Sequence, residues 1–361
     1  MKILTVVGAR PQFIKASVLS AELAKQGCVE RLVHTGQHYD YNMSRIFFEG
    51  LSIKEPDYYL DVGSASHAVQ TANIMTRLEP IIDAERPAWV IVYGDTNTTL
   101  AGALVASKLR VPLGHVEAGL RSFNRYEPEE VNRIVTDHIA DAHFASTSSS
   151  VEHLANEGIT ASVHTVGDLM VDLVKETAQR LARRPPVLER FALSSGTYGI
   201  ATVHRASNTE DSQTFESILQ GLRKLDFPVV FPIHPRSVPL FNASLAKYPK
   251  TNIMPCEPLS YTDMIALQAH ARVVLTDSGG IQKEALTLKI PCVTLRRETE
   301  WTETLADGWN ILAGCDPDLI WRAASRPKPA TEPGSYYGDG TTAARITTIL
   351  LAAATVQKAI A

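Results

Sequence analysis

Carboxylates and arginines gather in one short stretch of the sequence. The heptapeptide HVEAGLR occupies residues 115–121, and PEEVNR occupies residues 128–133. The apolar run at residues 111–116 predicts a short buried strand, and the PEE sequence predicts a helix start. Polar groups between these elements stand at the carboxyl end of a strand, where open α/β sheets bind ligands. The candidates for proton transfer or anion binding are Glu117, Arg121, Glu129 and Arg133.

The acids at this helix start also have a purely structural explanation. Glu129 and Glu130 would complement the positive end of the helix dipole. Acidic residues are common at helix starts for that reason alone. The two explanations stay open at this point.

Further titratable groups follow other predicted strands. YGDTN at residues 93–97 places Asp95 at the end of a strand in the same predicted sheet as Glu117. Several acids in one partly dry site push their pKa values apart, which yields an acid and a base. In the second half, His204 and His234 each end a predicted strand close to an arginine, where a histidine can face an anion or a reacting bond.

Two loops have the composition of phosphate sites. DSGGIQKEA at residues 277–285 opens a helix on a glycine pair, which presents backbone N–H groups to an anion, and Glu284 follows where it can accept from a ribose diol. GARP at residues 8–11 ends the first predicted strand, and Arg10 and Lys15 supply positive charge beside it. GxGxxG is absent, which argues against a nicotinamide enzyme.

Short β-branched runs alternate with longer amphipathic segments along the whole chain, a pattern typical of parallel sheets. The expected strands are residues 3–7, 32–34, 89–93, 113–116 and 143–145, and then 199–203, 229–233, 273–276, 292–295 and 310–312. The sequence thus predicts two doubly wound α/β domains facing across a cleft, at residues 1–168 and 169–341. A terminal helix at 342–361 is expected to pack back on the first domain.

Composition limits the possible partners. The chain has 361 residues and a net charge of -4, with a pI near 6.3. No nucleic-acid partner is expected, and no apolar run approaches the roughly 20 residues that span a bilayer. The four cysteines form no CxxC pair, so no metal site is expected. A strand-like run begins at Lys2 without an export signal, which predicts a cytoplasmic protein.

Taken together, these motifs resemble the non-hydrolysing UDP-N-acetylglucosamine 2-epimerases over nearly the whole chain. The resemblance also rests on GQH at residues 36–38 and HR at 204–205. It implies two Rossmann-like domains of the glycosyltransferase-B type, a UDP-sugar substrate, no cofactor and a homodimer. By motif, the catalytic residues are Asp95, Glu117, Glu129 and His204. The UDP contacts are Arg10, Lys15, His234, Ser278, Gly279, Gly280 and Glu284. The sugar contacts are Gln37, His38, Arg121, Arg125 and Arg133.

The family reaction proceeds in two steps. A base removes the C2 proton while UDP leaves C1, and UDP then re-adds as a proton returns on the opposite face. Loss of a stabilised diphosphate makes removal of this weakly acidic proton feasible. The resemblance does not assign a direction to each carboxylate.

Several positions depart from the common family pattern. Gln12 stands where the family has glutamate, Trp301 where it has arginine, and Met264 where an aromatic side chain often lies near uracil. Residues 63–68 lack the arginine and glutamine associated with allosteric activation. The departures resemble the branch that acts on UDP-2,3-diacetamido-2,3-dideoxyglucuronic acid for surface polysaccharide, including lipopolysaccharide O-antigen. Arg125, in a shortened loop, would recognise the C6 carboxylate of that sugar, although a solvated loop arginine is an equal alternative.

Other functions remain possible for such a sequence. UDP-N-acetylglucosamine, converted to UDP-N-acetylmannosamine, is the alternative substrate. A hydrolysing epimerase and a UDP-sugar glycosyltransferase share the architecture, because fold alone does not specify a reaction. A non-catalytic nucleotide-sugar sensor is the alternative of a different class, and the three intact acids argue against it.

Overall fold

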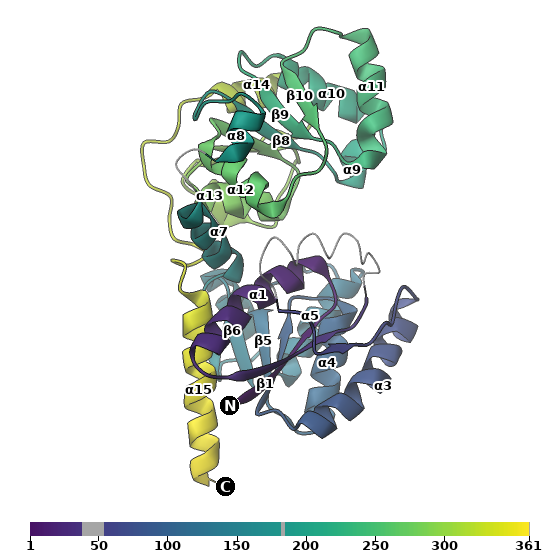
Figure 1. Ribbon diagram of the computed structural model, residues 1–361, viewed down its shortest axis with the longest axis vertical. Coiled ribbons are helices and arrows are strands. Elements are labelled where there is room, and N and C mark those ends of the chain that lie inside the picture. The colour runs from purple at the N-terminus through teal and green to yellow at the C-terminus, as the bar shows by residue number, and fades with distance from the viewer. Residues whose placement is uncertain (38–53, 182–184, 361) are drawn as a thin grey trace. The chain divides into compact units, whose positions relative to one another are not determined.

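The computed structural model describes residues 1–37, 54–181 and 185–360, and of Arg10, Arg236 and residues 354–360 it describes only the backbone. The chain forms two compact units (Figure 1). One comprises residues 1–173 and 336–361, and the other comprises residues 174–335. Helix α7 (Leu169–Arg180) begins at the expected boundary, and the chain passes from the first unit to the second within it.

The first unit contains a parallel sheet of seven strands in the order β3-β2-β1-β4-β5-β6-β7. Its strands are β1 (Lys2–Val7), β2 (Val29–His34), β3 (Tyr58–Tyr59), β4 (Trp89–Tyr93), β5 (Leu113–Ala118), β6 (Ala142–Ala145) and β7 (Val163–Thr165). Its helices include α1 (Arg10–Lys25), α3 (His67–Glu85), α4 (Asn97–Lys108), α5 (Pro128–Ile139), α6 (Ser148–Asn156) and α15 (Thr342–Ile360).

The second unit contains a parallel sheet of six strands in the order β10-β9-β8-β11-β12-β13. Its strands are β8 (Gly199–Thr202), β9 (Val229–Pro232), β10 (Ile253–Cys256), β11 (Val273–Thr276), β12 (Cys292–Thr294) and β13 (Asn310–Leu312). Its helices include α8 (Pro186–Arg190), α9 (Ala206–Thr209), α10 (Ser212–Arg223), α11 (Val238–Lys247), α12 (Tyr261–His270), α13 (Gly279–Thr287) and α14 (Pro317–Ser325).

Both sheets have the doubly wound strand order, so the prediction of two Rossmann-like α/β domains is confirmed. In each sheet the strand order reverses direction at one place, between β1 and β4 in the first unit and between β8 and β11 in the second. Loops on either side of such a point diverge and leave room for a ligand at the carboxyl ends of the strands. The fold therefore provides one candidate binding position in each unit.

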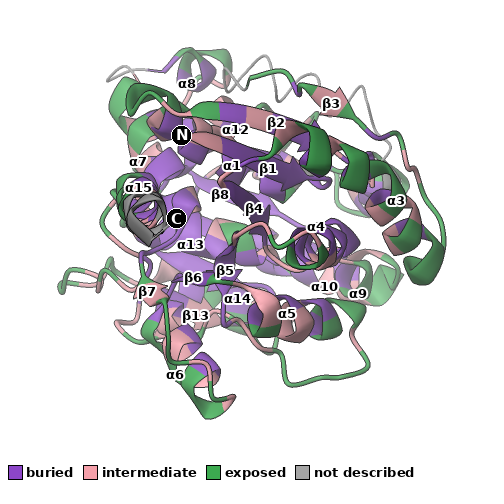
Figure 2. Cartoon of the chain, turned by 90° about the horizontal axis from the view of Figure 1, so that it is seen from below, coloured by how far each residue is buried: buried purple, intermediate pink, exposed green. Residues whose placement is uncertain are grey.

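The central strands carry continuous apolar runs because helices cover both faces of each sheet. All five residues of β4 and all four of β11 are buried, and Figure 2 shows the buried strands enclosed by helices with exposed outer faces. This enclosure makes the strand ends the place where polar side chains meet solvent.

The carboxyl-terminal helix α15 belongs to the first unit and packs against α1 (Figure 1). Two hydrogen bonds fix its start: Asp168 N donates to Tyr337 O at 2.8 Å, and Ala343 N donates to Asp172 Oδ2 at 2.8 Å. Among the helices of the described ranges, none is long and apolar enough to cross a bilayer.

Candidate functional site

Glu117 lies at the end of β5 with an unusual backbone conformation. Its φ is 69°, in the left-handed region, and the pairing of β5 with β6 shifts register between Val116 and Ala118. A non-glycine residue in this region is strained, and such strain clusters at functional sites. The neighbouring Gly94 also has a positive φ, and a Cβ there would lie 3.4 Å from Glu117 Oε2. The backbone is thus bent to present this carboxylate.

Lys15 of α1 forms a buried ion pair with Glu117. Burial acts to lower the pKa of Lys15, but the charges of Glu117, Asp168 and Asp95 outweigh it, so that the pKa is raised. Lys15 therefore carries its positive charge at neutral pH, among three acids. Lys15 is also an expected UDP contact, and its positive charge lies in the same region as the acids.

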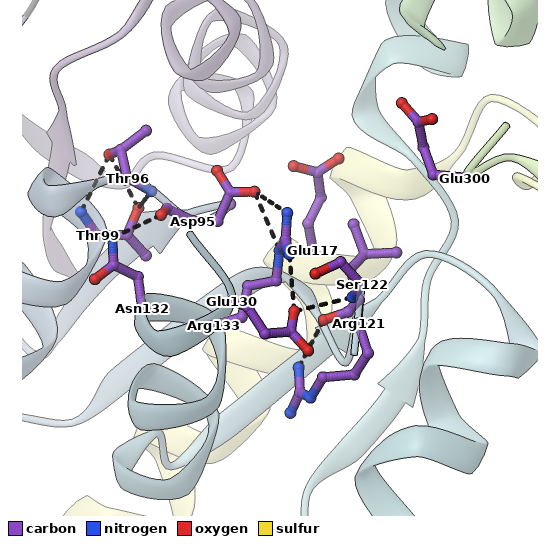
Figure 3. Close-up of polar contacts among 12 residues, drawn as sticks. Asp95, Thr96, Thr99, Glu117, Arg121, Ser122, Glu130, Asn132, Arg133 and Glu300 are labelled. Carbon is purple, nitrogen blue, oxygen red and sulfur yellow. Dashed lines mark hydrogen bonds and ion pairs between the residues drawn. The ribbon is translucent and has the colours of Figure 1, made fainter. Parts of the chain in front are cut away.

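Asp95 follows β4 and is held by Arg133 of α5. Arg133 Nη2 donates to Asp95 Oδ2 at 2.6 Å, and Arg133 Nη1 donates to Glu130 Oε2 at 2.9 Å (Figure 3). The two carboxylates raise the pKa of Arg133 despite its partial burial. Since both forks of the guanidinium are engaged, Arg133 links β4 to α5 in addition to any contact with a sugar.

Glu129 and Glu130 have different surroundings in the first turn of α5. Glu129 is exposed, whereas Glu130 is buried and accepts hydrogen bonds from Ser122 N and Phe123 N, both at 2.9 Å. Burial favours the protonated form of Glu130, but these N–H groups and Arg133 lower its pKa. Glu130 thus has a structural role, because its carboxylate holds the loop that carries Arg125.

Arg121, an expected sugar contact, pairs with two acids of the protein. Its guanidinium side chain is only 1% exposed and pairs with Glu157 at 2.7 Å and Asp137 at 2.8 Å. The structure thus places the side chain among protein partners, and its contact with a sugar stays a prediction. Arg121 anchors the active-site loop to the body of the first unit.

His115 joins this buried network beneath the loop. Its Nδ1 lies 2.6 Å from Asp137 Oδ1, and its Nε2 lies 2.8 Å from Gly94 O. Both ring nitrogens thus have a polar partner within hydrogen-bond distance. Burial would raise the pKa of Asp137, but His115 and Arg121 lower it. His115 thereby connects the ends of β4 and β5, on which Asp95 and Glu117 depend.

Gln12 is a site residue that sequence reasoning noted only as a departure. It is buried, its Oε1 accepts from Gly8 N at 2.8 Å and Ala9 N at 3.0 Å, and its Nε2 donates to Tyr93 O at 2.7 Å. The amide thus ties the loop after β1 to the loop after β4. A glutamate could not donate to the carbonyl oxygen, which explains what an amide does here.

The remaining predicted residues of the first unit are less informative. Gln37 Oε1 accepts from Thr98 N at 3.0 Å, which places its side chain at the start of α4. Arg125 is exposed on the loop before α5. His38 and the side chain of Arg10 lie outside the described residues.

In the second unit, His204 and Asp277 form a pair across the switch point. His204 Nδ1 lies 2.9 Å from Asp277 Oδ1, and Asp277 Oδ2 accepts from Arg205 N and Asn208 Nδ2, both at 3.0 Å. Burial would raise the pKa of Asp277, but His204 and these donors lower it. The carboxylate orients the half-exposed imidazole and turns its Nε2 edge away from Asp277.

Helix α13 begins at the end of β11 with the features of an anion site. Ser278 is the N-cap and makes no side-chain capping bond, and Gly279 and Gly280 form the first turn. A Cβ at Gly279 would collide with the Trp301 indole nitrogen and lie 2.8 Å from Glu300 Oε1. Glu300 in turn pairs with Arg205 at 3.3 Å and Arg296 at 2.7 Å. Glycine therefore permits the close approach of Trp301 and Glu300 to the helix start, and Glu300 brings two arginines near it.

Two further predicted contacts lie in this unit. Glu284 is buried within α13 and accepts from Gln268 Nε2 at 2.7 Å. His234 is exposed directly after β9, next to the strand that bears His204. The second unit thus brings His204, Ser278, Gly279, Gly280 and Glu284 to the ends of adjoining strands.

The two units define a class of protein: a pair of parallel-sheet α/β domains of the glycosyltransferase-B type, one with acids at its switch point and one with a helix that begins on a glycine pair. The sequence profile described as UDP-N-acetylglucosamine 2-epimerase matches residues 21–351. The chain belongs to this family.

Individual relatives match over almost their full lengths. The UDP-2,3-diacetamido-2,3-dideoxy-D-glucuronate 2-epimerase of Pseudomonas aeruginosa is 45% identical, over 96% of this chain and 98% of that protein. A UDP-N-acetylglucosamine 2-epimerase homolog of Methanococcus maripaludis is 44% identical over 97% and 99%. The crystal structure of Methanocaldococcus jannaschii UDP-GlcNAc 2-epimerase in complex with UDP-GlcNAc and UDP is 37% identical, with a TM-score of 0.80 over 97% and 99%. The protein is thus an isomerase, a UDP-sugar 2-epimerase.

Proposed function

We propose that the protein inverts C2 of UDP-2,3-diacetamido-2,3-dideoxyglucuronate and so forms its manno epimer, by elimination and re-addition of UDP. In the first step a base takes the C2 proton, the C1–O bond breaks, UDP leaves and a C1=C2 double bond forms. In the second step an acid returns a proton to C2 on the opposite face, while a UDP oxygen re-forms the bond to C1. No electron is exchanged with a cofactor.

The observation that carries this proposal is the strained Glu117 beside Lys15 at the switch point of the first unit. A carboxylate in this setting suits proton transfer, and the neighbouring cation suits the charge that develops as a diphosphate leaves. We assign proton transfer to Asp95, Glu117 and Glu129 as a set. In the second unit, His204 and the start of α13 would hold the departing diphosphate.

The proposed substrate carries a carboxylate at C6. The 45% identity to the Pseudomonas aeruginosa enzyme favours this sugar. Arg125 is exposed on a loop whose backbone is fixed by Glu130, so its guanidinium is available to pair with a carboxylate. The product would then supply the synthesis of surface polysaccharide, such as the O-antigen of lipopolysaccharide.

One experiment tests the reaction and the substrate together. The purified protein is incubated in deuterated water with the diacetamido-uronate and, separately, with UDP-N-acetylglucosamine, without nicotinamide cofactor or acceptor, and C2 is followed by NMR. Deuterium at C2 in two intact UDP-sugar epimers supports the reaction. Free sugar would indicate a hydrolysing enzyme, a requirement for an acceptor would indicate a glycosyltransferase, and inert substrates would indicate a sensor. Faster turnover of UDP-N-acetylglucosamine would overturn the proposed substrate.

Arg125 has a test of its own. Arg125→Ala should reduce the preference for the acidic sugar over the neutral one by roughly 10-fold or more, the usual scale for a lost charge-assisted hydrogen bond. The exposed Arg322→Ala, on α14, serves as the control for loss of one positive charge. If Arg125→Ala leaves the preference unchanged, Arg125 is a solvated loop residue that does not recognise the C6 carboxylate.

The setting of the reaction is also part of the proposal. The family resemblance favours a homodimer that works in the cytoplasm, where nucleotide sugars are made. Analytical ultracentrifugation tests the first statement, and fractionation of the source cells tests the second. A monomer at micromolar concentration, or recovery outside the cytoplasmic fraction, would contradict them.

A further inference from the structure

A buried amide lies against the carboxylate of Glu284. Gln268, on α12, is fully buried, and its Nε2 donates to Glu284 Oε2 at 2.7 Å. The two helices lie side by side in the second unit (Figure 1). This bond connects a residue in the last turn of α12 to the second turn of α13, the helix that begins with Ser278.

Gln268 has apolar neighbours along its own helix and near Glu284. Its chain neighbours Ala266 and Leu267, and Ala285 beside Glu284, belong to a buried apolar cluster. An amide in such a place must find partners or destabilise the fold. Gln268 satisfies only half of its amide group, because its Oε1 is buried without a donor among the residues that the structure describes.

That unsatisfied oxygen is informative. An unpaired buried acceptor is destabilising, so each one in a native structure calls for an explanation. The part of Gln268 that is engaged is the amide nitrogen, and its partner is Glu284. The geometry therefore indicates that the amide is present for the sake of the carboxylate.

Fixing one oxygen of a carboxylate fixes the direction of the other. A carboxylate has about four lone-pair positions, and the bond to Gln268 uses one of them. Glu284 is the acid expected to accept from the ribose diol, and an acceptor is effective only when it is held in the geometry of the bound state.

We propose that Gln268 is a positioning residue that orients the Glu284 carboxylate toward the ribose hydroxyls of UDP. The inference rests on the proposed binding of a UDP-sugar by the second unit. Gln268 does not itself touch the nucleotide. It determines how strongly the protein distinguishes a ribose from a deoxyribose.

The test compares two probes, UDP and 2′-deoxy-UDP, by isothermal titration calorimetry on the full-length protein. The wild type should bind UDP roughly 10-fold or more tightly than 2′-deoxy-UDP, the scale of a hydrogen bond to a charged acceptor. In Gln268→Met, which preserves side-chain length, this ratio should fall to about 3-fold or less. A purely structural effect would weaken both probes equally and leave the ratio unchanged.

Gln282→Met is the matched control. Gln282 is also a buried glutamine, on the same helix as Glu284, but its amide oxygen accepts from Thr299 and Asn310 instead. It should retain the wild-type ratio. Gln268→Leu provides a second variant with the same expectation as Gln268→Met, should the methionine variant fail to fold.

The outcomes separate the inference from the function on which it rests. Failure of the wild type to bind UDP would overturn the proposed function. A folded Gln268→Met or Gln268→Leu variant that binds UDP and keeps the wild-type ratio would overturn the role of Gln268. A ratio that also collapses in Gln282→Met would overturn it too, because the effect would then belong to buried amides in general.

Discussion

The two units of this protein have the same strand order and different chemistry at the corresponding place. In the first unit, the switch point gathers acids with their cations, as in the pair of Lys15 and Glu117. In the second, the corresponding point carries the buried acid Asp277, which organises His204 and the backbone before α9. The comparison teaches that the fold supplies a position and the side chains decide its chemistry.

The two sites also differ in the chemical event that each one suits. The carboxylates after β4 and β5 are presented by strained or glycine-rich backbone, which suits proton transfer at a fixed point. The start of α13 presents backbone N–H groups, which would bind an anion without changing protonation. If this division is correct, damage to the first unit should abolish turnover, and damage to the second should weaken or misplace the nucleotide.

Glu117→Gln should have the largest effect on turnover, and it tests the role of the first unit. Loss of the carboxylate removes a proton-transfer group, so turnover should fall by about 10²–10⁴-fold. Binding of UDP, measured by calorimetry, should persist, because the variant leaves the second unit unchanged. The exposed Glu152→Gln on α6 is the control. Turnover within 10-fold of the wild type would remove Glu117 from the chemistry.

Asp277→Asn tests the role of the second unit. The new amide would point a donor at groups that already donate, so unfolding should become easier by about 2–4 kcal/mol, and UDP binding should weaken. Because the pKa of Asp277 is lowered in the folded protein, its contribution is present at neutral pH and is lost as the pH falls through that lowered value.

Chemical denaturation between neutral and acidic pH measures this effect. The difference in the free energy of unfolding between the wild type and Asp277→Asn should become smaller below about pH 4. Asp226→Asn, with its acid on the surface, is the control. A gap that widens in acid would reverse the sign that we expect.

Glu129 and Glu130, in one turn of α5, should separate an effect on turnover from an effect on stability. Glu130→Gln should destabilise the first unit by about 1–3 kcal/mol, since it weakens the bonds that hold Ser122 and Phe123. Glu129→Gln should change stability by less than about 0.5 kcal/mol, as exposed positions usually do, and should reduce turnover. Stability curves and deuterium exchange at C2 measure the two effects, and the reverse pattern would transfer the catalytic role to Glu130.

Glu30, on β2, should give a small effect of the opposite sign. Burial raises the pKa of Glu30, although Thr5 Oγ1 donates to it at 2.6 Å. A raised pKa means that its contribution to stability is complete in acid and is lost as the pH rises through the folded value. Glu30→Gln should therefore stabilise the protein at neutral pH by about 0.5–1 kcal/mol, and the gain should vanish in acid. Thermal melts across pH check this, and a loss of stability at pH 7 would contradict it.

The central strands of both sheets could be predicted from the sequence, because they are continuous apolar runs between helices. The strands that were not predicted, β3, β7 and β10, are all edge strands. An edge strand pairs on one side only and can be short or contain proline, as β10 does at Pro255. The local pattern is weakest where pairing depends on the neighbouring strand.

Residues at strand ends could be proposed from the sequence, because polar groups after an apolar run have one expected place in an α/β sheet. Arg121 shows the limit of this argument. Sequence position put it beside Glu117, but three-dimensional packing turned it to Asp137 and Glu157. Gln12 was marked only as a departure from the family motif, and its hydrogen bonds could not be read from the sequence. Gln268 had no signal at all, since a single glutamine within a helix has no spacing that marks it.

The sequence by itself determined two α/β units, the strands at their centres and the acids and glycines at the strand ends. These follow from periodicity and from residue type, which are local properties of the chain. Only the tertiary structure decided which charged groups pair, which acid of α5 is buried and which amide holds Glu284. Those outcomes depend on contacts between residues distant in sequence, whose free energy is set by burial and geometry together.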